Sequence, residues 1–155
     1  YSPIIKAHPI KIEYYPENAT CYQKVDVFCS SNSSFMIISD NLGDEKTFNS
    51  GSGSVTVMAY PFMNVSCYNG YEYVQKQINI IKIKPSLTLT YNNETVTCET
   101  NMNDSVIYID INNKTVYGGF GKVSYKINPY ENLHISCVIP GNACQEEVTK
   151  NYTIS

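Results

Sequence analysis

The sequence predicts an all-β protein made of two tandem β-sandwich domains, each stapled by a disulfide. Three observations predict this fold. Apolar and polar residues alternate along most of the chain, the second half repeats the pattern of the first, and cysteines fall on matching strands of both halves. The chain has 155 residues, 43% apolar and 16% charged, so it can bury a core. We expect a first domain at residues 1–83 and a second at residues 84–155.

Each expected strand of the first domain is a short run with apolar residues at every second position, as in a strand with one buried face. The alternating sets are Ile10/Ile12/Tyr14, Val25/Val27/Cys29, Val55/Val57 and Met63/Val65/Cys67. Ile78, Ile80 and Ile83 are expected to end its last strand. Turn residues separate the runs, which predicts six or seven strands per domain.

The second domain repeats this order of strands and turns. Its alternating sets are Leu87/Leu89/Tyr91, Val96/Cys98, Ile107/Ile109/Ile111, Val123/Tyr125/Ile127 and Leu133/Ile135/Cys137. A glycine-rich turn precedes the same strand in each half, at residues 51–53 and 118–121. Because Tyr14 and Tyr91 are in phase with strand interiors, we expect both in the core.

Two cysteines in each half are expected to bridge the two sheets of a sandwich. Cys29 and Cys67 are 38 residues apart, and Cys98 and Cys137 are 39 residues apart. All four are in phase with the apolar face of their strands, so both members of each pair point inward. A bridge over a loop of this size stabilises a small domain by roughly 3–4 kcal/mol.

These motifs resemble the immunoglobulin superfamily, in tandem across nearly the whole chain. The resemblance rests on the Val-x-Val-x-Cys of residues 25–29, the Val-x-Cys of residues 96–98, and the late strands that end at Cys67 and Cys137. It implies minimal sandwiches of the constant-like (C2) type. The chain departs from the family in having no Trp. The tyrosine that the family has two residues before the late cysteine is also replaced, by Val65 in the first domain and by Ile135 in the second.

The missing tryptophan needs a substitute beside each bridge. Candidates are Ile37 or Ile38 in the first domain and Ile107 or Ile109 in the second.

Cys21 and Cys144 remain after the two inter-sheet bridges are assigned. Cys21 lies in an insertion between the first two strands of the first domain, and Cys144 lies in the last hairpin of the second. In immunoglobulin-like domains stacked end to end these two regions would face each other, so we predict a Cys21–Cys144 bridge between the domains. The alternatives are local bridges, a Cys21 that replaces Cys29 as inter-sheet partner, or a bond to another chain. Peptide mapping without reduction distinguishes them.

The number of N-glycosylation acceptor sites predicts where in or outside the cell the protein is located. The pattern Asn-x-Ser/Thr occurs at seven asparagines, whereas roughly three are expected by chance in a chain of this composition. The acceptors are Asn18, Asn32, Asn64, Asn93, Asn103, Asn113 and Asn151. Together with an even number of cysteines they predict an oxidised, glycosylated extracellular protein, secreted or at the cell surface, carrying N-linked glycans.

Several functional classes are disfavoured. A net charge of −3 provides no basic surface for nucleic acid, and no apolar run approaches the roughly 20 residues of a membrane span. There is no Cys-x-x-Cys pair, and His8 and His134 are the only histidines, so no metal site, cofactor or catalytic residue is expected. We therefore expect a protein that is not an enzyme.

The expected function is binding of a protein partner, and the tyrosine content of the chain supports this expectation. The chain has 14 Tyr, and Asn69-Gly70 predicts a tight hairpin turn among three of them, Tyr68, Tyr71 and Tyr73. We expect these five residues to bind a protein partner at the tip of the first domain, in an adhesion or receptor module or a secreted decoy. Tyrosines that merely cover sheet edges are the simpler interpretation.

A different class of function remains open. Glycosylated, disulfide-stapled repeats also build extracellular coats and filaments, in which the partner is another copy of the chain.

Overall fold

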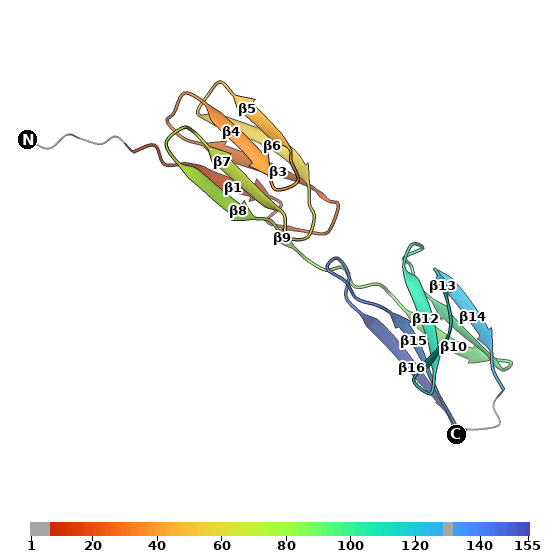
Figure 1. Cartoon of the computed structure of the whole chain (residues 1–155). Coiled ribbons are helices and arrows are strands. Elements are labelled where there is room, and N and C mark those ends of the chain that lie inside the picture. The colour runs from red at the N-terminus through yellow and green to blue at the C-terminus, as the bar shows by residue number, and fades with distance from the viewer. Residues whose placement is uncertain (1–6, 129–131) are drawn as a thin grey trace, which may run out of the picture. The chain divides into compact units, whose positions relative to one another are not determined.

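The structure is a computed structural model that describes residues 7–128 and 132–155 (Figure 1). Its described residues form sixteen strands and no helix. The chain divides into two compact units, residues 1–81 (domain 1) and residues 82–155 (domain 2). This division lies two residues before the expected boundary, because Ile83 forms a bridge with Gln145 and so belongs to domain 2.

Domain 1 is a sandwich of two antiparallel sheets. Its strands are β1 (Lys11–Tyr15), β2 (Asn18–Ala19), β3 (Lys24–Ser30), β4 (Met36–Asp40), β5 (Glu45–Phe48), β6 (Ser52–Met58), β7 (Asn64–Tyr68), β8 (Tyr73–Gln77) and β9 (Asn79–Ile80). One sheet has the order β1-β3-β6 and the other the order β5-β4-β7-β8. The alternation that predicted these strands is visible in β3, where Val25, Val27 and Cys29 are buried and their neighbours are exposed.

The core of domain 1 lies between these sheets around a disulfide. Cys29 of β3 and Cys67 of β7 are bonded and almost completely buried, so the bridge joins the two sheets as expected. Ile38 is the register partner of Cys67 and is 2% exposed. It is therefore the isoleucine that packs beside the bridge in place of tryptophan, and Tyr14, at 6% exposed, completes the core as predicted.

Domain 2 repeats the arrangement. Its strands are β10 (Thr88–Asn92), β11 (Thr95–Glu99), β12 (Val106–Ile111), β13 (Lys114–Phe120), β14 (Lys122–Lys126), β15 (Leu133–Ile139) and β16 (Val148–Ile154). The sheets have the orders β10-β11-β14 and β13-β12-β15-β16, and Cys98 of β11 is bonded to Cys137 of β15. Ile109 opposes Cys137 in register, while Tyr91 is only partly buried and stacks on Tyr152.

Both domains have the immunoglobulin-like topology. In each, the first, second and fifth main strands form one sheet, and the remaining four form the other, with the bridge between the second and sixth strands. The strand after β4, or after β12, pairs within the four-stranded sheet. The opposite sheet therefore has three strands and ends at β6 or β14, as in C2-type domains.

The end of domain 1 differs from the expected strand through Ile78 and Ile80. β8 ends at Gln77, and the short strand β9 leaves it to pair in parallel with β2. β2 lies in the insertion that contains Cys21, so this insertion forms its own two-stranded sheet with the end of the domain. Two-residue strands have no periodicity from which they could be predicted.

Cys21 and Cys144 are both disulfide-bonded. Their pairing with each other stays a prediction. The described segments also include no helix long and apolar enough to cross a bilayer.

Candidate functional site

The hairpin between β7 and β8 carries the predicted binding residues. Its loop comprises residues 69–72, and the backbone N–H of Asn69 donates to the carbonyl oxygen of Glu72 at 3.3 Å. Gly70 has a φ of +89°, a conformation that glycine adopts without strain. The loop is thus longer than the two-residue Asn-Gly turn that the sequence predicted.

Asn69 is the largest departure from the predicted site. Its side chain is completely buried, so it cannot contact a partner as expected. The side-chain nitrogen donates to the carbonyl oxygen of His8 at 3.0 Å and to Oγ of Ser31 at 3.1 Å. The side-chain oxygen accepts from the backbone N–H groups of Tyr71 at 3.0 Å and Glu72 at 2.9 Å.

These four bonds use both donors and both lone pairs of the amide. They tie together three segments that are far apart in the sequence: the residues before β1, the loop after β3, and the hairpin itself. Asn69 is therefore a positioning residue that fixes the loop from inside.

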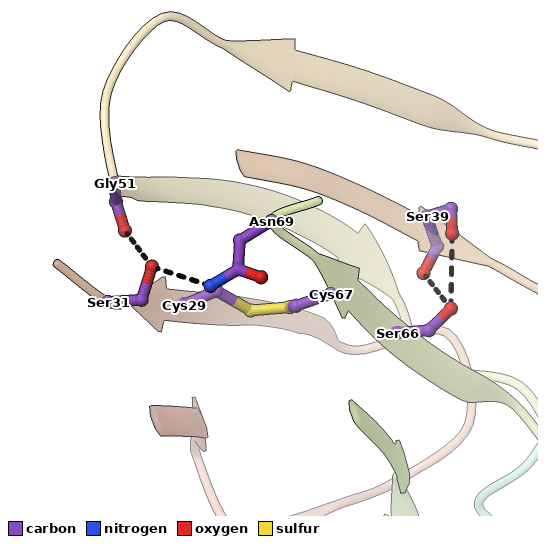
Figure 2. The surroundings of a disulfide bond; sticks show 7 residues. All are labelled: Cys29, Ser31, Ser39, Gly51, Ser66, Cys67 and Asn69. Carbon is purple, nitrogen blue, oxygen red and sulfur yellow. Dashed lines mark hydrogen bonds between the residues drawn. A yellow bond between two sulfur atoms is a disulfide. The ribbon is translucent and has the colours of Figure 1, made fainter. Parts of the chain in front are cut away.

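The loop after β3 supports Asn69 through serine hydroxyls. Figure 2 shows Ser31 between Asn69 and Gly51, beside the Cys29–Cys67 bridge. The backbone N–H of Ser31 donates to the carbonyl oxygen of Gly51 at 2.7 Å, and its hydroxyl lies 2.6 Å from that of Ser33. Ser33 in turn donates to the carbonyl oxygen of Phe35 at 2.9 Å. This network anchors the loop on the rigid part of the sandwich.

His8 joins the hairpin from the N-terminal side. Its ring stacks on that of Tyr71, with centroids 3.9 Å apart and planes inclined by 12°. Its Nδ1 lies 2.8 Å from Oδ1 of Asn32, and the nearby N–H of Ile10 donates to the carboxylate of Glu72 at 3.2 Å. No local sequence pattern links His8 to a hairpin residue 63 positions later, so its place in this site could not be predicted.

The remaining aromatic side chains lie where the hairpin strands begin and end. Tyr68 and Tyr73 are direct register partners, so their side chains share the outer face of the sheet. The ring of Phe35 meets that of Tyr68 edge to face, with centroids 6.3 Å apart. Tyr71 and Tyr73 are 69% and 62% exposed, and Tyr68 is 42% exposed.

We call the group of His8, Phe35, Tyr68, Tyr71 and Tyr73 the hairpin surface. Of the predicted residues, Tyr68, Gly70, Tyr71 and Tyr73 are exposed on or beside it, and Asn69 lies beneath it.

No family model and no curated protein match this chain. Solved structures to which this chain is similar include the fibronectin(III)-like modules of Clostridium thermocellum CbhA. The two are 8% identical, the match covers 94% of this chain and 92% of that chain, and the TM-score is 0.38. The human OSCAR ligand-binding domain has 10% identity, coverage of 96% and 98%, and a TM-score of 0.37. A marsupial T cell receptor has 8% identity, coverage of 96% and 62%, and a TM-score of 0.34.

The immunoglobulin-like fold of each domain is thus defined by its own strand order and by the position of its inter-sheet bridge.

The glycosylation acceptors are compatible with modification. Asn64 is partly buried, and the other six are exposed: Asn18, Asn32, Asn93, Asn103, Asn113 and Asn151. Asn32 borders the hairpin surface. Its Oδ1 faces His8, whereas an N-linked glycan is attached through Nδ2. The contact with His8 and a glycan on Asn32 are therefore compatible.

Proposed function

We propose that this chain is an extracellular recognition module that binds a protein partner through the hairpin surface. The observation that carries this proposal is the combination of exposed aromatic rings with a loop fixed from inside by Asn69. Tyr71 and Tyr73 expose most of their surface, while the backbone between the strands is held by four side-chain hydrogen bonds.

This combination favours binding for two physical reasons. Tyrosine offers a large amphipathic contact area at a low cost in side-chain entropy. A loop that is already ordered also avoids the conformational cost of ordering it on association. Stacking on His8 holds the Tyr71 ring in one orientation, so this side chain also loses little conformational freedom on association.

The extracellular location is part of the proposal. Three features support it: the inter-sheet disulfides Cys29–Cys67 and Cys98–Cys137, the disulfide-bonded state of all the cysteines, and seven glycosylation acceptors.

The test is a binding screen with matched variants. The chain, produced by secretion from eukaryotic cells and displayed as a tetramer, is applied to an array of purified extracellular proteins. A partner recognised by the proposed site should bind at least about tenfold more weakly to the double variant Tyr71→Ala, Tyr73→Ala. The double variant Tyr117→Ala, Phe120→Ala is the control, because these aromatic residues are exposed in domain 2 at 47% and 67%.

Equal binding by both double variants would remove the hairpin surface as the site. Sedimentation of the purified chain tests the coat or filament alternative, since concentration-dependent polymers would favour self-assembly over recognition of a separate partner.

A further inference from the structure

Strand β6 leaves one side of domain 1 open. Among the residues that the structure describes, it is an edge strand that pairs only with β3, because β5, the strand that follows β4, pairs on the other sheet. Gly53, Val55 and Val57 alternate with exposed residues and are themselves only partly buried. No strand of the described segments pairs with the outer backbone edge of β6, and its inward side chains are incompletely covered.

A groove of about 590 Å³ opens at this position between the two sheets. Its apolar wall includes Val55 and Val57 of β6 and Ile38 and Val65 of the opposite sheet. Met58 and Tyr60 line it as well. The volume falls within the roughly 300–1,000 Å³ typical of ligand sites.

The matching edge of domain 2 is built differently. There β14 has a lysine at each end, Lys122 and Lys126, whereas β6 has no charged residue. Lysines on an edge strand discourage pairing with another chain. The neighbouring strand β13 spans seven residues against four for β5, and Gly119 of β13 lets Val123 pack directly against it. Domain 1 lacks these protective lysines, and the strand beside β6 is shorter: the ring of Phe48 of β5 packs against Gly53, while Val55 and Val57 stay partly exposed.

Acidic residues outnumber basic ones in the lining of the groove. Its lining residues include three acidic ones, Asp40, Asp44 and Glu45, and one basic one, Lys46. Oδ1 of Asp40 accepts the backbone N–H groups of Leu42 at 2.8 Å and Asp44 at 3.1 Å, which fixes the loop that carries these acids. The electrostatic complement of the groove is therefore a basic segment.

We propose that this groove binds an extended basic peptide segment of another protein, which pairs with β6 as an added strand. Its backbone would hydrogen-bond to the free edge of β6, alternate apolar side chains would enter the groove, and its Lys or Arg side chains would face Asp44 and Glu45. Pairing of β6 with β6 of a second copy is disfavoured, because it would bring together two surfaces with the same acidic rim.

A defined peptide tests this proposal with the whole chain. The probe is a fluorescein-labelled peptide of sequence Lys-Val-Thr-Val-Thr-Val-Lys, whose binding is followed by fluorescence anisotropy up to millimolar concentration. We expect saturable binding, and protection of the amides of β6, but not those of β14, from hydrogen exchange. A peptide with Glu in place of both Lys, and one with every amide between the lysines N-methylated, should each bind at least about tenfold more weakly.

A matched pair of protein variants tests whether the acidic residues of the groove attract the basic peptide. The double variant Asp44→Asn, Glu45→Gln should weaken binding of the basic probe by about three- to tenfold, whereas Glu146→Gln, Glu147→Gln removes the same charge from domain 2 and should leave it unchanged.

Three results would overturn the proposal: no binding, equal binding of the N-methylated peptide, or no protection in β6. Protection of β6 that appears on concentrating the chain without peptide would also overturn it and identify a second copy as the occupant.

Discussion

The side-chain amide of Asn69 donates a hydrogen bond to Oγ of Ser31 at 3.1 Å, directly beside the Cys29–Cys67 bridge (Figure 2). Each of the two residues stands two positions after one of the bridged cysteines. The disulfide therefore brings together the ends of β3 and β7, and the hydrogen bond continues this link into the two loops. In domain 2 the position matching Asn69 is Ile139, which is also completely buried.

The comparison with Ile139 indicates that the sandwich itself does not require a polar group at this position. Asn69 instead organises the hairpin, because each of its four bonds goes to a loop or to the segment before β1.

Replacement of Asn69 is expected to destabilise domain 1. Asn69→Ala removes four part-buried hydrogen bonds and leaves a cavity where the amide was completely buried, which should cost about 3 kcal/mol. In calorimetry, this corresponds to a fall of more than about 10 °C in the melting temperature of domain 1. Asn49→Ala is the control, since Asn49 is exposed. Equal melting temperatures for the two variants would contradict the structural role of Asn69.

The sandwiches and their bridges could be predicted because they follow from local pattern. Alternation places Val25, Val27 and Cys29 on one face of a strand whatever the rest of the chain does, and the matching spacing in the second half repeats the information. The exposed tyrosines Tyr71 and Tyr73 could also be predicted, since they lie next to turn residues.

The interior of the site could not be predicted, because it depends on contacts over long distances in the sequence. Asn69-Gly70 indicates a tight turn, but the bonds from Asn69 to His8 and Ser31 draw its side chain inward. The stacking of His8 on Tyr71 has no local signal either. The groove was missed for a related reason, because it results from the shortness of β5 and from the sheet on which that strand pairs.

Gly51 is expected to tolerate no side chain. A Cβ atom added there would overlap the carbonyl oxygens of Ser31 and Ser33, which belong to the loop that supports Asn69. Gly51→Ala should therefore cost about 2–3 kcal/mol through overpacking and displace the loop. Urea unfolding measures this cost, and hydrogen exchange of residues 31–35 reports the displacement.

Gly43→Ala provides the comparison for Gly51. A Cβ atom at Gly43 would meet nothing within 4 Å, but the φ of +101° disfavours any side chain. The expected cost is about 1 kcal/mol. A larger loss of stability in Gly43→Ala than in Gly51→Ala would show that the backbone around Gly51 adjusts easily.

The two inter-sheet bridges should contribute about equally to their domains. The cysteines are separated by 38 residues in domain 1 and by 39 in domain 2, so the loop-closure entropy is nearly the same and corresponds to about 4 kcal/mol each. We expect the double variant Cys29→Ala, Cys67→Ala to lower the melting temperature of domain 1. The double variant Cys98→Ala, Cys137→Ala should lower the melting temperature of domain 2 by a similar amount. A stability loss below about 1 kcal/mol in either would contradict a stapling role for that bridge.

Asn32 is expected to carry a glycan at the edge of the hairpin surface without disturbing it. Ser34→Ala removes the acceptor pattern but keeps Asn32 and its 2.8 Å contact with His8, whereas Asn32→Gln removes the acceptor and alters that contact. Both variants should lose the mass of one glycan in intact-mass spectrometry. Only Asn32→Gln should increase hydrogen exchange at residues 8–10 and 69–73, because His8 holds Tyr71 in place. If Ser34→Ala increases exchange to the same extent, the glycan and not the His8–Asn32 contact orders the loop.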